Sequence, residues 1–229
     1  GHAGSFNIVY KATETFLRTF ESSLIGQGYD KAEGYSGDVF RLSYTDGKFK
    51  KGEALKLPGG INIYDFQFLY SSDGKKAVMA WDNIGFVNLY SESYNLIWRT
   101  QEDFGGFSVG YKKDAPTVMV ERGSWFIKDR LIMKNNAVFV PKKKPLLGIA
   151  KGLGYSSSEI KSLWWNGFSV EEGKLLEEIG GEILDYSIIG DKIYVLSNPL
   201  LGINFKNIMK GENPIGIMLY VFSLKARGF

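Results

Sequence analysis

Short runs of aromatic and β-branched residues recur along the whole chain, and each run is closed by Gly, Asn, Asp or Ser. Runs of this kind are typical of β-strands. They lie at residues 39–44, 63–70, 77–81, 86–90, 95–100, 117–121, 137–140, 193–196 and 218–222. Helical periodicity is nearly absent, and its best candidate is residues 171–179. The pattern therefore predicts an all-β fold, and strands arriving about every 8–12 residues fit a sandwich, a barrel or a propeller.

An internal repeat favours the propeller among these three. Residues 34–65 align with residues 154–185 with few gaps, which indicates a duplicated unit of about 85–95 residues. Glycine pairs also recur 46 positions apart, at Gly59 with Gly60 and at Gly105 with Gly106. A period in the forties with four short strands is typical of propeller blades.

One blade is predicted in full, with antiparallel strands at residues 61–69, 76–81, 85–91 and 94–101. Each glycine pair then marks the corner where the chain runs inward to the next blade. Glycine suits such a corner because it accepts positive φ, and Gly60, Gly106 and Gly181 are predicted to be equivalent. This count gives about five four-stranded blades, or part of a larger propeller.

The predicted domain organisation is a single propeller domain over residues 6–229. Its internal duplication covers about residues 7–91 and 130–223. Residues 1–5 are small and patternless, and they are interpreted as a cloning remnant.

Composition excludes several classes of function. The formal net charge is only +3, which argues against a nucleic-acid partner. There is no Cys, so disulfides, thiolate catalysis and zinc-thiolate sites are ruled out. The single His is His2, within the interpreted remnant. No apolar stretch approaches the roughly 18 residues of a membrane span, and we therefore expect no transmembrane segment.

Residues 63–106 resemble the FG-GAP or VCBS repeats of bacterial, integrin-alpha-like propeller proteins, with a turn, a strand and a closing hairpin in the family's order. This resemblance implies an exported protein of the periplasm, cell envelope or extracellular space, with a protein or glycan as its partner. In that family an acidic loop commonly holds calcium. Asp73 is the only acid in the matching loop, residues 70–74, so we expect neither metal nor cofactor here.

The candidate binding residues are Trp165, Tyr155, Lys142, Lys143 and Lys144. Trp164 and Trp165 are neighbours on a predicted strand, so one of them faces outward and could stack on a sugar or peptide. The three lysines are the densest positive patch, which either holds an anion or protects a strand edge.

Two long connections, residues 13–37 and 141–158, end in the same Gly-Tyr-Ser triplet, which contains Tyr155 in the second. Rigid scaffolds usually carry recognition on such segments.

Catalytic groups are scarce, because neither Cys nor a native His is available as nucleophile or base. Two acid pairs, Glu171 with Glu172 and Glu177 with Glu178, leave a propeller-type carbohydrate hydrolase as an alternative. The sequence therefore predicts a non-catalytic binding or scaffold propeller that engages its partner through loops. A purely structural domain of a longer chain is the other alternative.

Overall fold

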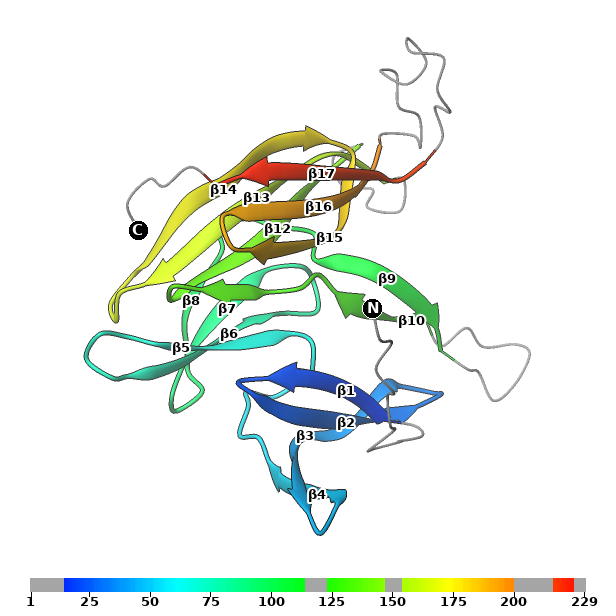
Figure 1. Cartoon of the computed structure of the whole chain (residues 1–229), viewed down its shortest axis with the longest axis vertical. Coiled ribbons are helices and arrows are strands. Elements are labelled where there is room, and N and C mark those ends of the chain that lie inside the picture. The colour runs from blue at the N-terminus through cyan, green and yellow to red at the C-terminus, as the bar shows by residue number, and fades with distance from the viewer. Residues whose placement is uncertain (1–14, 114–122, 147–153, 200–215, 225–229) are drawn as a thin grey trace, which may run out of the picture. The chain divides into compact units, whose positions relative to one another are not determined.

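A computed structural model of the chain describes residues 15–113, 123–146, 154–199 and 216–224, and these ranges contain strands and turns only (Figure 1). No helix that could cross a membrane occurs in them. The strands are β1 (Thr15–Phe20), β2 (Ser23–Asp30), β3 (Gly34–Thr45), β4 (Lys48–Ala54), β5 (Phe66–Tyr70), β6 (Lys76–Trp81), β7 (Val87–Ser91), β8 (Leu96–Arg99), β9 (Phe107–Lys112), β10 (Ser124–Lys128), β11 (Ile132–Lys134), β12 (Ala137–Pro145), β13 (Tyr155–Trp165), β14 (Val170–Gly180), β15 (Glu182–Ile189), β16 (Lys192–Asn198) and β17 (Met218–Ser223).

Four blade-type sheets follow one another along the chain, and in each of them consecutive strands are antiparallel neighbours. Sheet I contains β1–β2–β3–β4, sheet II β5–β6–β7–β8, sheet III β11–β12–β13–β14 and sheet IV β15–β16–β17, while β9 and β10 form a two-stranded ribbon. The predicted all-β propeller is therefore confirmed. Its described part has four blade-type sheets, where the sequence suggested about five.

Sheet II matches the blade that was predicted strand by strand. Its turns are tight: Ser71 N–H donates to Lys75 O at 2.9 Å, and Asp82 N–H donates to Phe86 O at 2.9 Å. Gly74 and Gly85 have φ of +82° and +99° in these turns, where glycine avoids the strain of a side chain. The first strand begins at Phe66 and not at residue 61, and the third and fourth strands, Val87–Ser91 and Leu96–Arg99, are shorter than predicted.

The prediction of a long connection at residues 13–37 is wrong, because its described part consists of β1, β2 and the first residues of β3. The turn between β1 and β2 is formed by Glu21 and Ser22, with φ of +46° and +60°. Two-residue hairpin turns need such positive φ values, but they are usually made by Asn, Asp or Gly. The turn was therefore missed in the sequence.

Two further expectations are corrected in sheet III. The helix candidate at residues 171–179 lies within strand β14. The second expected connection, residues 141–158, is largely strand in its described part, because β12 continues to Pro145 and β13 begins at Tyr155. Residues 147–153 of that segment lie outside the described residues.

The chain divides into two compact units, residues 1–64 with 110–125 and residues 65–109 with 126–229. A single domain over residues 6–229 stays a prediction. The first unit contains sheet I, and its buried side chains include Ile25, Phe40, Leu42 and Ile63. Gln27 is also buried, and its side chain donates to Gly37 O at 2.9 Å and accepts from Ile63 N–H at 2.9 Å. These bonds tie the segment after β4 to the sheet.

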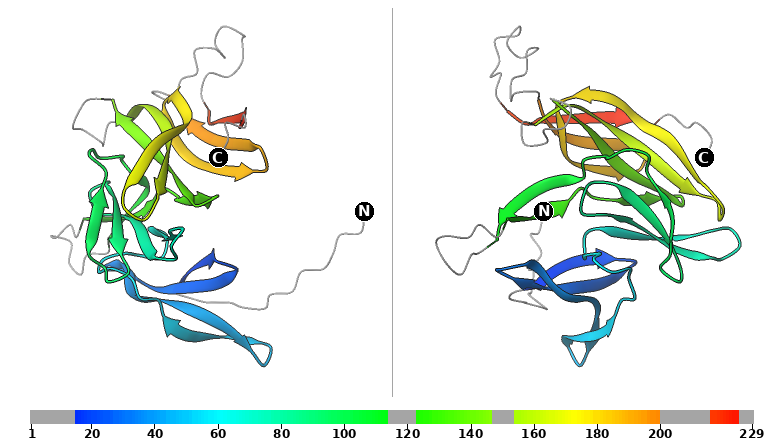
Figure 2. Two further views of the ribbon diagram at one scale, coloured as in Figure 1. Left: turned by 90° about the vertical axis from the view of Figure 1, so that its left-hand side faces the viewer. Right: turned by 180° about the vertical axis from the view of Figure 1, so that it is seen from behind.

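In the second unit, sheet III is covered on both faces (Figure 2). Val138, Val140 and Leu163 pack against the buried side chains of sheet II. Phe139 and Ile160 pack against the buried side chains of sheet IV. Successive residues of a strand point to opposite faces, and this alternation lets one strand serve two cores.

The internal repeat falls on equivalent strands. Gly34 and Gly154, with φ of +84° and +88°, lie at the start of β3 and directly before β13, which are the third strands of sheets I and III. The corner glycines Gly60, Gly106 and Gly181 have φ of +78°, +68° and +89°, as their predicted role requires.

Candidate functional site

Trp165 lies in the core between sheets II and III, where its side chain is only 3% exposed. It cannot serve as an outward stacking platform, and this expectation is corrected. Its neighbour Trp164 points to the other face of β13 and is exposed. The alternation along the strand was thus expected correctly, but the inward position belongs to Trp165 because that face packs on sheet II.

The three lysines lie on β12 and do not form one positive patch. Lys144 is exposed. Lys142 is half-buried and pairs with Glu102. Lys143 points into the protein and is almost fully buried. The expected anion-binding triplet is therefore replaced by three different environments, since the middle residue of an alternating strand must face the other way.

Lys143 is the centre of a buried ionic cluster. Its Nζ lies 3.0 Å from Asp129 Oδ1 and 3.0 Å from Glu182 Oε1. The Tyr155 ring also lies here, with its centroid 5.4 Å from that Nζ. Burial, together with the nearby Glu182 and Asp129 carboxylates, raises the pKa of Tyr155 to about 12. The structure thus brings Tyr155 and Lys143 together, but inside the protein.

Asp129 belongs to a segment that runs from the last residue of β10 to the residue before β11, residues 128–131, which we call the junction. Each of its first three side chains forms an ion pair with a different partner. Lys128 Nζ lies 3.0 Å from Asp65 Oδ2 and Arg130 lies 2.6 Å from Asp185 Oδ2, while Asp129 pairs with Lys143.

The main chain of the junction is held from both neighbouring sheets. From sheet II, Trp81 Nε1–H donates to Asp129 O at 2.8 Å and Gln67 Nε2–H donates to Leu131 O at 2.6 Å. From sheet IV, the Tyr186 hydroxyl lies 2.9 Å from Arg130 O. Burial raises the pKa of Tyr186 well above its ordinary value, so it stays a hydrogen-bond donor. The charges and the main chain of the junction therefore join neighbouring sheets, with Lys128 and Asp129 buried and the Arg130–Asp185 pair exposed.

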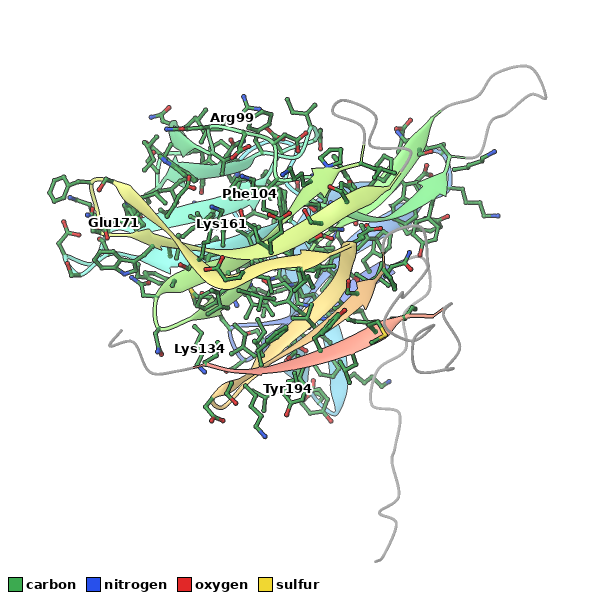
Figure 3. The ribbon with its side chains drawn as sticks, turned by 90° about the horizontal axis from the view of Figure 1, so that it is seen from above. Arg99, Phe104, Lys134, Lys161, Glu171 and Tyr194 are labelled. Atoms are coloured by element: carbon green, nitrogen blue, oxygen red, sulfur yellow. The ribbon has the colours of Figure 1, made fainter. Side chains whose placement is uncertain are left out.

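A second charged group lies on β13 and β14 of sheet III, where Lys161 is labelled in Figure 3. Glu159 lies 3.3 Å from both Lys161 Nζ and Lys174 Nζ. Burial tends to raise the pKa of Glu159, but the two lysines outweigh it and hold the pKa below its ordinary value. This group is a cross-strand ion-pair network on β13 and β14.

The acid pairs proposed for a hydrolase are all exposed on β14, with Glu171 beside the β13–β14 turn (Figure 3). Glu178 accepts a hydrogen bond from Ser157, and Glu177 lies 3.6 Å from Lys174. Glycoside hydrolysis needs two carboxylates facing each other across the sugar. Four acids along one exposed strand do not provide that arrangement.

The loop that matches the family's calcium loop is held by other contacts. Lys75 Nζ lies 2.7 Å from Asp73 Oδ2, and Ser71 Oγ donates to the same carboxylate. Lys75 and Ser71 lower the pKa of Asp73 to about 2. One carboxylate paired with a lysine does not fit a calcium ion, which takes six to eight oxygen ligands. Among the described residues, no group of three acidic or imidazole side chains could hold a metal.

Four exposed aromatic side chains lie at one end of sheets II and III. They lie in or beside three turns, residues 71–75, 92–94 and 166–169, which we call the turn face (Figures 1 and 2). The aromatic residues are Tyr70, Tyr94, Trp164 and Phe168. The turns at 71–75 and 166–169 contact each other, because Lys75 Nζ lies 5.0 Å from the centroid of the Phe168 ring.

Phe168 is the outermost of these rings, with 90% of its surface exposed. Its turn is well defined: Asn166 Oδ1 accepts hydrogen bonds from the N–H groups of Phe168 and Ser169, each at 2.9 Å. Gly167 supplies a φ of +101°. The Asn-Gly pair at 166–167 is a strong hairpin signal, and it could have indicated this turn in the sequence.

A comparison of the sequence with models of known protein families finds no match, and neither does a comparison with curated proteins.

Proposed function

We propose that this chain is a non-catalytic binding or scaffold propeller of an exported bacterial protein, and that it engages a protein or glycan of the cell envelope through the turn face. The observation that carries the proposal is the exposure of Phe168 on a hydrogen-bonded turn. Large aromatic side chains held rigidly at a surface lose little entropy on binding, and they are common anchors of interfaces.

The burial of two lysines also supports this proposal. Lys128 and Lys143 are enclosed and paired with carboxylates inside the protein, so their charge is not presented to a ligand at the surface. The exported location and the envelope partner rest on the resemblance of residues 63–106 to FG-GAP repeats.

The test compares Phe168→Ala with Ile84→Ala. Ile84 is an exposed apolar residue in the turn between β6 and β7, at the other end of sheet II from the turn face. Wild type and both variants are immobilised and probed with purified envelope polysaccharides, peptidoglycan fragments and isolated envelope proteins by surface plasmon resonance.

We expect at least one probe to bind wild type and Ile84→Ala equally, and to bind Phe168→Ala about tenfold more weakly, which corresponds to loss of one aromatic anchor. Equal binding by all three proteins would contradict the proposed role of the turn face in binding. Release of reducing sugar from any polysaccharide would instead support the hydrolase.

A further inference from the structure

The hairpin of β3 and β4 extends beyond the other two strands of sheet I. The pairing of β2 with β3 ends at Leu42, whereas β3 continues to pair with β4 as far as Thr45 (Figure 1). Asp46 and Gly47 form the turn, with φ of +54° and +75°. Both residue types are favoured in such a turn, so the hairpin is well specified by its own sequence. We call its projecting part, residues 43–51, the arm.

One face of the arm is aromatic. Tyr44 and Phe49 lie opposite each other on β3 and β4, and their ring centroids are 4.9 Å apart. Leu42 precedes Tyr44 on the same face of β3 and is buried, whereas Tyr44 is 59% exposed. The apolar face of sheet I therefore continues beyond its buried part as a pair of rings, of which Tyr44 is open to solvent.

The arm is also positively charged. It contains three exposed lysines, Lys48, Lys50 and Lys51, and Asp46 is its only acid. The carboxylate of Asp46 lies 3.6 Å from Lys50 Nζ. Within the described ranges, neither Lys48 nor Lys51 has a carboxylate partner. Two ammonium groups of the arm are thus available to an anionic ligand.

Lys51 brings one of these charges to the aromatic face. It lies opposite Leu42 and two positions after Phe49, so its side chain shares the face of the two rings. Its Nζ lies 4.6 Å from the centroid of the Phe40 ring, a contact that restrains the ammonium group. Two positions along a strand span about 7 Å. A ligand stacked on Tyr44 can therefore place an anionic substituent near Lys51.

Protection of a sheet edge accounts for only part of this arrangement. Among the described strands, β4 is the last of sheet I, and lysines on such a strand prevent pairing with other chains. That role does not require an exposed tyrosine ring beside the lysines, because exposed apolar surface favours association. The aromatic face and the two uncompensated charges together are typical of a binding surface.

We propose that the arm binds an acidic polysaccharide, with the Tyr44 ring stacked on a sugar and with Lys48 and Lys51 paired with carboxylates of the polymer. The C–H face of a pyranose ring is apolar, while its hydroxyl groups stay hydrated, and a tyrosine ring is a rigid partner for such a face. Charge complementarity then selects an acidic polymer over a neutral one.

Two other anionic partners fit this surface less well. A bilayer would first meet the tip of the arm, which carries the exposed carboxylate of Asp46, and anionic lipids repel that charge. A nucleic acid requires many cations along its backbone, whereas the net charge of the whole chain is only +3. The proposed site shares no residue with the turn face and does not depend on it.

The test measures binding of the full chain to polygalacturonate, alginate and hyaluronate by isothermal titration calorimetry, with neutral dextran for comparison. We expect at least one of the three acidic polysaccharides to bind and dextran not to bind. An increase from about 50 to about 300 mM salt is expected to weaken binding about tenfold, because dissolved ions screen the lysine charges.

Variants of the arm identify the groups responsible. We expect Tyr44→Ala to weaken binding about tenfold and Lys51→Gln about fivefold. Tyr44→Phe and Lys51→Arg keep the ring and the charge, and both are expected to bind within about twofold of wild type. Phe168→Ala is the control on the turn face, and it is expected to bind as wild type does. Thermal unfolding followed by circular dichroism confirms that each variant folds.

Several outcomes would overturn the proposal. They are no binding of any acidic polysaccharide, equal binding of dextran, and binding that Tyr44→Ala and Lys51→Gln leave unchanged. Tighter binding to phosphatidylglycerol vesicles or to single-stranded poly(dT) would assign the arm to a membrane or a nucleic acid instead. Loss of binding in Phe168→Ala alone would also overturn it, while supporting the role proposed above for the turn face.

Discussion

The ammonium group of Lys143 lies 3.0 Å from a carboxylate oxygen of Asp129, and both side chains are almost completely enclosed by the protein. Glu182 completes the arrangement from the first strand of sheet IV. An enclosed charge is stable only while its partner is present, because water cannot solvate the charge that remains. The contact is therefore a sensitive probe of how the sheets are joined.

We expect Lys143→Met to lower the free energy of unfolding by about 3–5 kcal/mol, since it leaves two carboxylates without their lysine. Lys144→Met is the matched control on the same strand, and its exposed side chain predicts a change within about 0.5 kcal/mol. Urea denaturation followed by tryptophan fluorescence measures both. Equal effects would show that the buried cluster contributes no more than a surface lysine.

The corner glycines allow a graded test of backbone strain. At Gly60 an added methyl group would have no neighbouring atom within 4 Å. Gly60→Ala is therefore expected to lower the free energy of unfolding by about 1–2 kcal/mol, because of the positive φ alone. At Gly106 the methyl group would also lie 2.8 Å from the Trp81 ring. Gly106→Ala is therefore expected to lower the free energy of unfolding by more than about 3 kcal/mol. Gly59→Ala, which has open space and no positive φ, is expected to be nearly neutral. Denaturation midpoints showing no difference between Gly59→Ala and Gly106→Ala would rule out the corner role.

The buried phenol of Tyr155 predicts a loss of stability in alkali. An unfolded tyrosine loses its proton near pH 10, whereas the folded pKa is about 12, so the folded state binds more protons between these values. Stability is therefore retained below pH 10 and falls as the pH rises toward 12. Tyr155→Phe is expected to make this fall shallower, and Tyr44→Phe, at an exposed tyrosine, is expected to leave it unchanged. The measurement is the denaturant midpoint between pH 9 and 12. Identical profiles for Tyr155→Phe and wild type would contradict the prediction.

The contacts of Asp73 predict that calcium does not change the thermal stability of the protein. Its carboxylate is engaged by Lys75 and Ser71, and it is the only acid of its turn. We expect millimolar calcium or a chelator to shift the melting temperature by less than about 1 °C, because stabilisation by a ligand requires preferential binding to the folded state. A rise of several degrees with calcium, reversed by chelator, would show that a site had been overlooked.

Sheet II could be predicted from the sequence because its turns carry the expected residues. Ser71–Lys75 contains Asp-Gly, and the apolar runs FQFLY and AVMAW flank it at residues 66–70 and 77–81. The turn between β1 and β2 carries no such signal, since Glu21 and Ser22 adopt positive φ without the side chains that favour it. The turn therefore had no recognisable signal in the sequence, and β1 and β2 were not predicted.

In the candidate site, too, the sequence predicted some features and missed others. The sequence indicated that one of Trp164 and Trp165 faces outward, but which one depends on the sheet that packs against β13. The burial of Lys143 depends on Asp129, 14 positions away, and on Glu182, 39 positions away. A lysine triplet gives no local sign that its middle member has two distant acidic partners.

The junction at residues 128–131 has a consequence for the order in which the second unit forms during synthesis. Lys128 is 63 positions from Asp65, and the Trp81 indole bonds to a carbonyl 48 positions further along the chain. Sheet II therefore leaves the ribosome with a buried acid and an indole whose partners have not yet been made. Arg130 in turn awaits Asp185, 55 positions later. Closing such long loops is slow compared with forming local hairpins. Nascent chains that end before residue 128 should hence be loosely folded and good substrates for chaperones, and they should become compact only after the strands of sheets III and IV have been made.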